Sequence, residues 1–348
     1  MNCQTFATRS VLDGFLTKAF YAYRQGLLRQ PQPHTPMPPR DFDALKFLGT
    51  VGWVSLEDRL HLRNMHIYCS KGLSAAREGR LDDSLVHYEQ ARQRLDLLED
   101  SQLAWLLGAS SYQAGIAYLD FRRGYVELAH ERLDSAMDAD SKLEQVGLPI
   151  MQLHRIQQGH NLARMALRLG RRETAIGLAG ILLAYMERRT DDLPYHRDWS
   201  SKLLQAVPRS LLKAMIHQII GETAGYIVTG EEPMEEWRVL LEACRLCQDP
   251  ETAIFPQVQY ALKAQHERLV DDPESYLRNL ERFFHLGIRH CHLLWYAVII
   301  ELVGFCREVD TRHSCKVLDI ILRDSAKWKG LPPFLRDRLD HSAVQHTV

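Results

Sequence analysis

Few residues in this chain have both the type and the spacing that catalysis or metal binding requires. Cys244 and Cys247 form a C-x-x-C pair, and a second group of conceivable zinc ligands contains His290, Cys291 and His292. Structural zinc sites usually lie in short loops with turn residues. The C-x-x-C pair instead lies within an apolar helical pattern, where cysteines three residues apart share one face. We therefore predict that these side chains pack inside a helical core and hold no metal.

Adjacent aspartates invite comparison with the magnesium sites of all-helical cyclases. They occur as three pairs: Asp82 and Asp83, Asp191 and Asp192, and Asp271 and Asp272. A magnesium site of that kind needs carboxylates three or four residues apart in the interior of a helix. These pairs lie at expected helix starts or in loops, where they suit the helix dipole or a turn. The sequence also has no nucleophile elbow, phosphate loop or dinucleotide fingerprint. We predict no catalytic residue and no cofactor, and a protein that is not an enzyme.

Three arginines recur at a fixed place in the sequence. Each stands two residues before a glycine: Arg77, Arg122 and Arg168 before Gly79, Gly124 and Gly170. The glycines are 45 and 46 residues apart. Glycine can end a helix in the left-handed conformation at little steric cost, and acidic residues shortly after each glycine suit the start of another helix. We therefore interpret each glycine as the turn of a helical hairpin.

The second helix of each hairpin also repeats its residue types. The fifth, ninth and twelfth positions after the glycine hold Ser84, Tyr88 and Ala91; Ala129, Leu133 and Ala136; and Ala175, Ala179 and Leu182. Small residues let the second helix approach the first, and a bulky residue at the ninth position fills the gap between neighbouring hairpins. The repeat therefore predicts hairpins that stack on one another.

These positions resemble the tetratricopeptide repeat, a helix-turn-helix unit of about 34 residues. The matching residues are Tyr68, Gly72, Gly79, Ser84, Tyr88 and Ala91; then Ala117, Gly124, Ala129, Leu133 and Ala136; then Ala163, Ala166, Gly170, Ala175 and Ala179. The spacing here is longer, and the proline that usually closes a unit is missing from the first two. The resemblance implies an all-α fold in which antiparallel helical hairpins form a right-handed superhelix, an α-solenoid.

In such repeats the first helix of each unit lines a concave groove. The resemblance therefore implies a set of groove residues: Arg77, Tyr118, Arg122, His160, Asn161, Arg164 and Arg168. Guanidinium groups in a row could bind carboxylates or phosphates through paired hydrogen bonds. The alternative is structural, because an arginine in the last turn of a helix also stabilises free carbonyls and the helix dipole. The groove predicts a protein or peptide partner with an acidic or anionic segment.

Composition restricts the remaining function classes. Lys and Arg number 43 and Asp and Glu number 44, so the formal net charge is -1 and no overall field attracts nucleic acid. The most apolar stretch, 293–305, has 13 residues and contains Glu301, whereas a membrane-spanning helix needs roughly 20. The seven cysteines are an odd, scattered set, and the N-terminus lacks a secretory pattern. We expect a cytoplasmic protein that binds neither nucleic acid nor membrane.

Helical spacing continues through almost the whole chain and predicts three segments. Residues 1–40 hold a first helix, over 11–28, and a proline-rich linker. Residues 41–195 hold the repeats, and residues 196–348 hold divergent hairpins that continue the solenoid. The hairpins of the last segment are expected with a turn near Gly230, over 255–286 and over 288–328. The alternative for this segment is a separate helical bundle.

The groove and the absence of catalytic groups predict a non-enzymatic scaffold or regulator. As a regulator, the first helix and its linker would rearrange when the groove is occupied, an arrangement similar to that of bacterial peptide-responsive regulators. The alternative is a helical enzyme or small-molecule-binding protein with a pocket in the C-terminal half, formed by Trp295, Tyr296, His290 and His292. An uncovered apolar end helix around 293–300 would also favour a homodimer.

Overall fold

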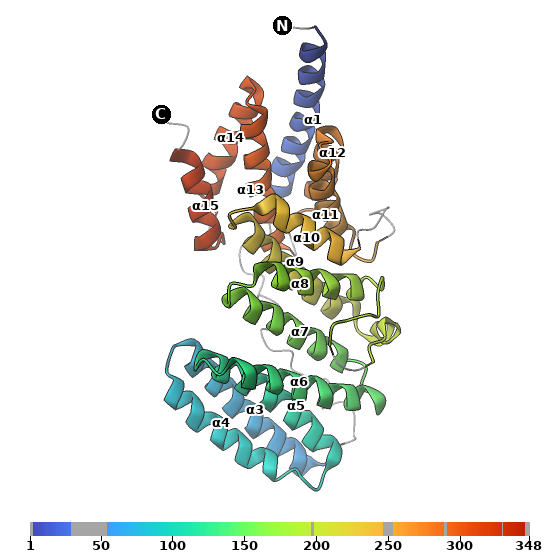
Figure 1. Cartoon of the computed structure of the whole chain (residues 1–348), viewed down its shortest axis with the longest axis vertical. Coiled ribbons are helices and arrows are strands. Elements are labelled where there is room, and N and C mark those ends of the chain that lie inside the picture. Colours follow the sequence, from blue (N-terminus) through green and yellow to red (C-terminus); the bar gives the residue numbers. More distant parts are fainter. Residues whose placement is uncertain are drawn as a thin grey trace. The chain divides into compact units, whose positions relative to one another are not determined.

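The computed structural model describes residues 3–28, 54–195, 198–245, 253–288, 291–328 and 330–344. Within these ranges every regular element is a helix and no residue lies in a strand, so the predicted all-α class is confirmed (Figure 1). The proline-rich linker, Cys247 and His290 lie outside the described residues. The chain divides into two compact units.

The first unit, called here the repeat unit, contains residues 54–178 together with the described residues of 190–212. Its helices are α3 (Leu56–Arg77), α4 (Leu81–Asp96), α5 (Gln102–Arg122), α6 (Val126–Gln145), α7 (Met151–Arg168), the start of α8 (Arg172–Met186), the short 3-10 helix η1 (Ser201–Ala206) and the first turn of α9 (Arg209–Val228). Helix α3 packs against α4 and α5, and α6 packs against α5 and α7.

The three repeated glycines lie at equivalent turns, as predicted. Gly79, Gly124 and Gly170 have φ angles of +84°, +87° and +75°, in the region that side chains disfavour. After each glycine the next backbone N–H donates to the carbonyl five residues earlier, at 2.9 Å in all three turns. This is the Schellman pattern of a helix end. The same local geometry therefore closes α3, α5 and α7.

The repeated positions of the second helices are also buried, as the pattern predicted. In the first hairpin, the Ser84 hydroxyl donates to the Gly72 carbonyl at 2.8 Å. The Tyr88 ring fills the gap to the next hairpin: a methyl group on Gly72 would lie 2.8 Å from the ring, and one on Gly115 would lie 3.0 Å from its hydroxyl. Glycines on α3 and α5 thus make the space that Tyr88 occupies.

The second unit, called here the terminal unit, contains the described residues of both ends of the chain and residues 179–189. Its helices are α1 (Cys3–Leu28), the rest of α8 and α9, α10 (Pro233–Cys244), α11 (Pro256–Leu269), α12 (Pro273–His285), α13 (His292–Val309), α14 (Arg312–Ser325) and α15 (Pro333–Val344). The turn near Gly230 and the helix pairs α11–α12 and α13–α14 lie where the sequence predicted hairpins.

The first helix is part of the terminal unit, whereas the sequence predicted a separate segment over residues 1–40. Helix α1 packs along α12 and touches α14, far from it in sequence (Figure 1). The Tyr23 ring of α1 stacks on Trp295 at 5.6 Å between centroids. Its hydroxyl donates a hydrogen bond to Asp324 at 3.2 Å. Residues 190–212 conversely belong to the repeat unit. The boundaries expected at residues 40 and 195 are therefore not those of the compact units.

The apolar stretch of α13 is covered within the same chain. Its residues from Leu294 to Val303 are all buried. Trp295 contacts aromatic rings of α1, α12 and the residues after α14: Tyr23, Phe284 and Trp328. The uncovered end helix that favoured a homodimer is thus absent from this part of the described chain.

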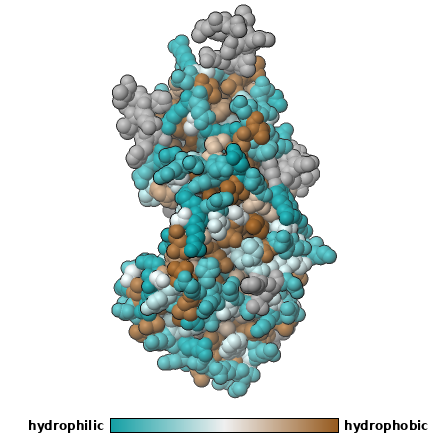
Figure 2. All heavy atoms as spheres, in the orientation of Figure 1, coloured by the Kyte–Doolittle hydropathy of each residue, from teal (hydrophilic) through white to brown (hydrophobic). Residues whose placement is uncertain are grey.

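The described helices can be compared with the dimensions of a bilayer. In the described ranges no helix combines the length and apolar character that crossing a bilayer requires. On the visible face, hydrophilic and hydrophobic residues are interspersed over each unit (Figure 2).

Candidate functional site

The junction between α5, α6 and α7 in the repeat unit is unusually polar. Counting back from the turn glycines Gly124 and Gly170, which we call the glycine register, aligns three positions of α5 with three of α7. Gly108, Tyr112 and Gly115 correspond to His154, Gln158 and Asn161. In α5 these positions pack on the first hairpin through apolar contacts, such as Tyr112 with Tyr88 at 6.2 Å between ring centroids. In α7 the same face carries hydrogen-bonding side chains. An apolar contact between hairpins is therefore replaced by a polar one.

Ser110, Asp140 and His154 form the inner end of this junction. The Ser110 hydroxyl donates to Asp140 Oδ1 at 2.5 Å and lies 2.9 Å from His154 Nδ1. The other carboxylate oxygen of Asp140 lies 2.8 Å from the same Nδ1 atom. Ser110 and Asp140 are fully buried. We call these three residues together with Gln158 and Asn161 the polar seam.

The seam contains the residue types of a hydrolase triad, but its geometry is different. In a catalytic triad the aspartate and the serine meet opposite nitrogens of the imidazole, so that the ring can pass a proton between them. Here both meet Nδ1, and Nε2 lies 3.0 Å from the amide nitrogen of Gln158. The Ser110 hydroxyl donates its proton to Asp140 and is buried. This arrangement positions the three side chains and does not activate a nucleophile.

The surroundings of His154 in the seam shift the pKa of its imidazole. Burial on its own would lower the pKa of His154, but the neighbouring Asp140 carboxylate and its hydrogen bond outweigh that effect and raise the pKa. In this arrangement Nδ1 faces Asp140 and Nε2 faces the amide nitrogen of Gln158, whose oxygen accepts a hydrogen bond from Asn161.

The seam reaches toward two of the residues predicted to line a groove. Asn161 donates to Gln158 Oε1 at 3.0 Å and accepts from Arg164 Nη1 at 3.0 Å. Both Asn161 and Arg164 are half-buried. Gln157, one turn earlier, also donates to Asn161, at 3.3 Å. The partly exposed polar face of α7 is therefore connected by hydrogen bonds to the buried Asp140.

The three repeated arginines occupy equivalent places in the structure. Arg77, Arg122 and Arg168 are the last residues of α3, α5 and α7. Arg77 and Arg168 are exposed, and within the described residues neither makes a hydrogen bond or an ion pair. Arg122 is half-buried and donates to the Tyr118 hydroxyl at 3.2 Å, with its guanidinium 5.9 Å from the centre of that ring. Tyr118 and Arg122 are thus brought together, as a partner site would require.

His160 differs from the expectation for a groove residue, because its side chain is buried and only 2% exposed. On α7 it is rotated by about 100° from Asn161 but by only about 40° from Arg164, so burial and not the helix face alone separates it from Arg164. The glycine register located α7 correctly but not the direction of this side chain. His160 is therefore not available to a ligand in this structure.

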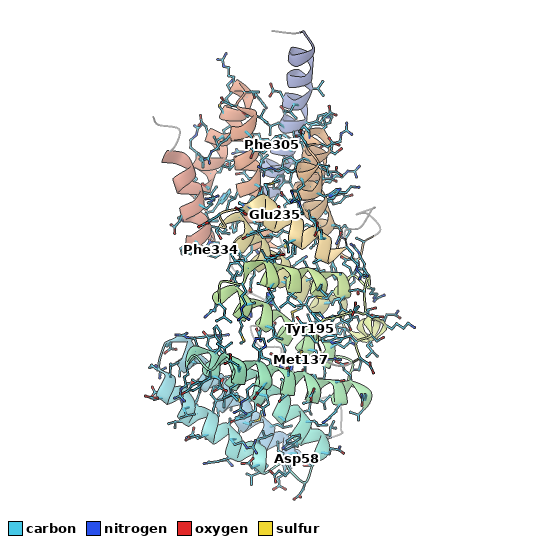
Figure 3. All side chains as sticks on the ribbon, in the orientation of Figure 1. Asp58, Met137, Tyr195, Glu235, Phe305 and Phe334 are labelled. Atoms are coloured by element: carbon cyan, nitrogen blue, oxygen red, sulfur yellow. The ribbon has the colours of Figure 1, made fainter. Side chains whose placement is uncertain are left out.

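A buried ion pair also joins α7 to α6. Arg155 is fully buried and donates to Glu144 at 2.8 Å, with its guanidinium 3.9 Å from the centre of the Trp199 ring. Burial raises the pKa of Glu144 to about 7, because lost hydration outweighs the attraction of Arg155. Tyr195 lies beside α7 and donates to the Gly159 carbonyl at 3.3 Å (Figure 3). These contacts attach the segment after α8 to α7, a structural role.

Two of the residues named in the alternative hypothesis differ in exposure. Trp295 is buried among aromatic side chains, and His292 is exposed. Cys244 and Cys291 are buried free thiols, and burial raises the pKa of each to about 12, as the packing interpretation predicted. In the part of the chain that the structure describes, no three His, Cys, Asp or Glu side chains gather as metal ligands would.

Sequence reasoning missed the buried members of the seam. Ser110, Asp140, His154 and Gln158 carry no motif, and their spacing across three helices has no recognisable period. The glycine register could have indicated His154 and Gln158, since it aligns them with the packed positions Gly108 and Tyr112. Comparison of the chain with models of known protein families, with characterised proteins and with solved structures finds no match in any of the three.

Proposed function

We propose that this chain is a non-enzymatic scaffold or regulator that binds a protein or peptide partner along α3, α5 and α7. The hairpins would stack as a tetratricopeptide-like superhelix, and the first helices would line its groove. The proposed contact residues are Arg77, Tyr118, Arg122, Asn161, Arg164 and Arg168. A cytoplasmic location fits the free cysteines.

One observation carries the proposal: the repeated arginines keep their positions but have no carboxylate partner among the described residues. Other arginines of the repeat unit do pair, with Arg80 2.7 Å from Glu78 and Arg123 3.2 Å from Asp82. Arginine that has no carboxylate partner and is repeated at one helix position can bind a chain of carboxylates without first breaking an internal ion pair. An acidic segment is accordingly the proposed ligand.

The test is a charge reversal, Arg77→Glu with Arg122→Glu and Arg168→Glu. Tagged wild-type and variant proteins are used for affinity capture from a lysate at about 50 mM and 500 mM salt, and captured proteins are compared by mass spectrometry. We expect the wild type to capture an acidic protein at low salt and the variant to lose it, because attraction becomes repulsion.

A matched control separates binding from helix stability. Arg94→Glu with Lys142→Glu removes a basic residue from the last turn of α4 and α6, the second helices of their hairpins. The control loses the same kind of helix-dipole stabilisation but changes a different face. If both variants capture the same proteins as the wild type, while circular dichroism shows intact helices, the arginines have only the structural role.

A further inference from the structure

The first helix of the repeat unit has an apolar stripe exposed to solvent. Leu56, Leu60 and Ile67 of α3 are 78%, 55% and 44% exposed. Their spacing of four and seven residues places them along one side of the helix. Isolated exposed apolar residues are common on proteins, but three in one row on a helix form a surface that another element can cover.

The repeat register identifies what kind of element fits this stripe. Adding the 45-residue repeat aligns Leu60, Arg63, Ile67 and Ser70 of α3 with Trp105, Gly108, Tyr112 and Gly115 of α5. In α5 that face receives the preceding hairpin: a methyl group on Gly108 would lie 2.7 Å from Leu95 and 3.3 Å from Met65. The stripe of α3 is thus the equivalent of a helix-binding face, and among the described residues of the repeat unit no hairpin comes before α3.

The charges around the stripe are mainly basic. Arg59, Arg63 and Lys71 are exposed, and Arg63 and Lys71 stand one turn before and after Ile67. The acidic residues of α3, Glu57 and Asp58, lie only in its first turn. Beyond the helix, Glu78 is paired with Arg80 at 2.7 Å. A helix that covers the stripe would therefore gain from carboxylates at its own edges.

We propose that the outer face of α3 is a docking site for an acidic amphipathic helix of another protein. The apolar side of that helix would pack on Leu56, Leu60 and Ile67, and its flanking carboxylates would pair with Arg63 and Lys71. The partner helix would lie along α3 and bury its apolar residues, which are spaced three and four apart, against the stripe. A second copy of this chain is a poorer occupant, since two such faces would bring Arg59, Arg63 and Lys71 against the same cations. The site is separate from the arginines at the helix ends.

The test uses a fluorescein-labelled synthetic helical peptide of about 20 residues as the probe, with leucines spaced three and four apart and glutamates on both sides of them. Binding to the full-length protein is measured by fluorescence anisotropy. We expect Leu60→Glu with Ile67→Glu, and separately Arg63→Glu, to weaken binding about tenfold or more, because each places a negative charge against the peptide. Leu60, Arg63 and Ile67 are all exposed, so these substitutions should leave the fold intact.

Three controls make the result specific. Val86→Glu changes an apolar residue of α4 that is also exposed, at 52%, and should leave binding unchanged. A peptide of the same composition in scrambled order should not bind. The Arg77→Glu, Arg122→Glu and Arg168→Glu variant should still bind the probe, so failure of the proposed function would be distinguishable from failure of this docking site.

The proposal is overturned by equal binding of the wild type and the α3 variants, or by dimers that dissociate on Ile67→Glu. It is also overturned if the probe binds only after Leu45, Phe47 and Leu48 are replaced by serine in the full chain. That result would assign the stripe to the chain's own preceding segment.

Discussion

At the scale of single residues, the repeat unit depends on where glycine leaves space. Gly72 and Gly115 lie on either side of the Tyr88 ring, which is fully buried. A tyrosine in such a gap has no room to move when a neighbour grows, because packed interiors have few voids. The bulky residue at the ninth repeat position therefore has a packing role, and the glycines opposite it share that role.

We predict that Gly72→Ala destabilises the protein although alanine favours helices. The new methyl group would lie 2.8 Å from the Tyr88 ring. Overpacking of this kind costs about 1–3 kcal/mol, offset in part by about 1 kcal/mol of helix propensity. The free energy of unfolding, measured in urea, should fall by up to about 2 kcal/mol.

Gly177→Ala is the matched control, because a methyl group there meets no atom within 4 Å. Gly177 lies within α8, so this change should raise the free energy of unfolding by about 0.5–1 kcal/mol. Equal effects of the two substitutions would show that the Tyr88 ring is not held between the glycines.

At the scale of helices, the polar seam makes the contact of α7 different from that of α5. Ser110 of α5, Asp140 of α6 and His154 of α7 are joined by hydrogen bonds shorter than 3 Å. Buried polar groups are costly when one partner is lost, since the remaining group keeps its desolvation penalty. The orientation of α7, and of the Asn161 and Arg164 side chains on it, therefore depends on Asp140.

We predict that Asp140→Asn lowers the pKa of His154 below that of an exposed histidine. Without the carboxylate, burial is the main remaining influence, and burial disfavours the charged imidazole. The pKa is measured by NMR titration of the ring proton resonances. In the wild type the folded pKa is raised. The stabilisation from His154 is therefore complete below the unfolded pKa of about 6.5 and lost as pH rises through the folded value.

Asp134→Asn is the control for this titration, because Asp134 is exposed on the same helix, α6. It should leave the His154 titration unchanged. An unaltered His154 pKa in Asp140→Asn would instead mean that the carboxylate is not what raises the pKa of the ring.

At the scale of the whole molecule, the two ends of the chain meet in the terminal unit. Two residues of α1 contact α14 or its N-cap. The Thr311 hydroxyl at the N-cap donates a hydrogen bond to Asp13 at 3.1 Å, and Arg24 forms an ion pair with Asp324 at 2.7 Å. A helix with this many contacts to distant residues is an integral part of a core. A regulator in which α1 rearranges would have to break these contacts, so the proposed function does not include that movement.

We predict that Tyr23→Ala destabilises the terminal unit strongly. The substitution removes a buried ring from between Trp295 and Phe284, and such truncations cost about 3–5 kcal/mol. Urea unfolding should shift accordingly, and the tryptophan fluorescence of the folded state should move to longer wavelength as Trp295 becomes hydrated. Tyr21→Ala, on the same helix but 61% exposed, should change neither. Equal stability of the two variants would show that α1 is only loosely attached.

The sequence by itself determined the local features. A glycine with positive φ at the end of a helix needs only its own turn, so Gly79, Gly124 and Gly170 were recognisable from their spacing. Burial of the fifth, ninth and twelfth positions followed from helical periodicity, and the remaining helix pairs followed from the apolar pattern of each helix.

The tertiary structure alone decided which distant elements meet. No period in the sequence connects Tyr23 with Trp295 and Asp324, or Ser110 with Asp140 and His154. These contacts depend on chain segments that approach only after the helices pack. Periodicity reports the buried side of a helix but not its neighbour. For the same reason, the register located α7 while the buried position of His160 became evident only from the fold.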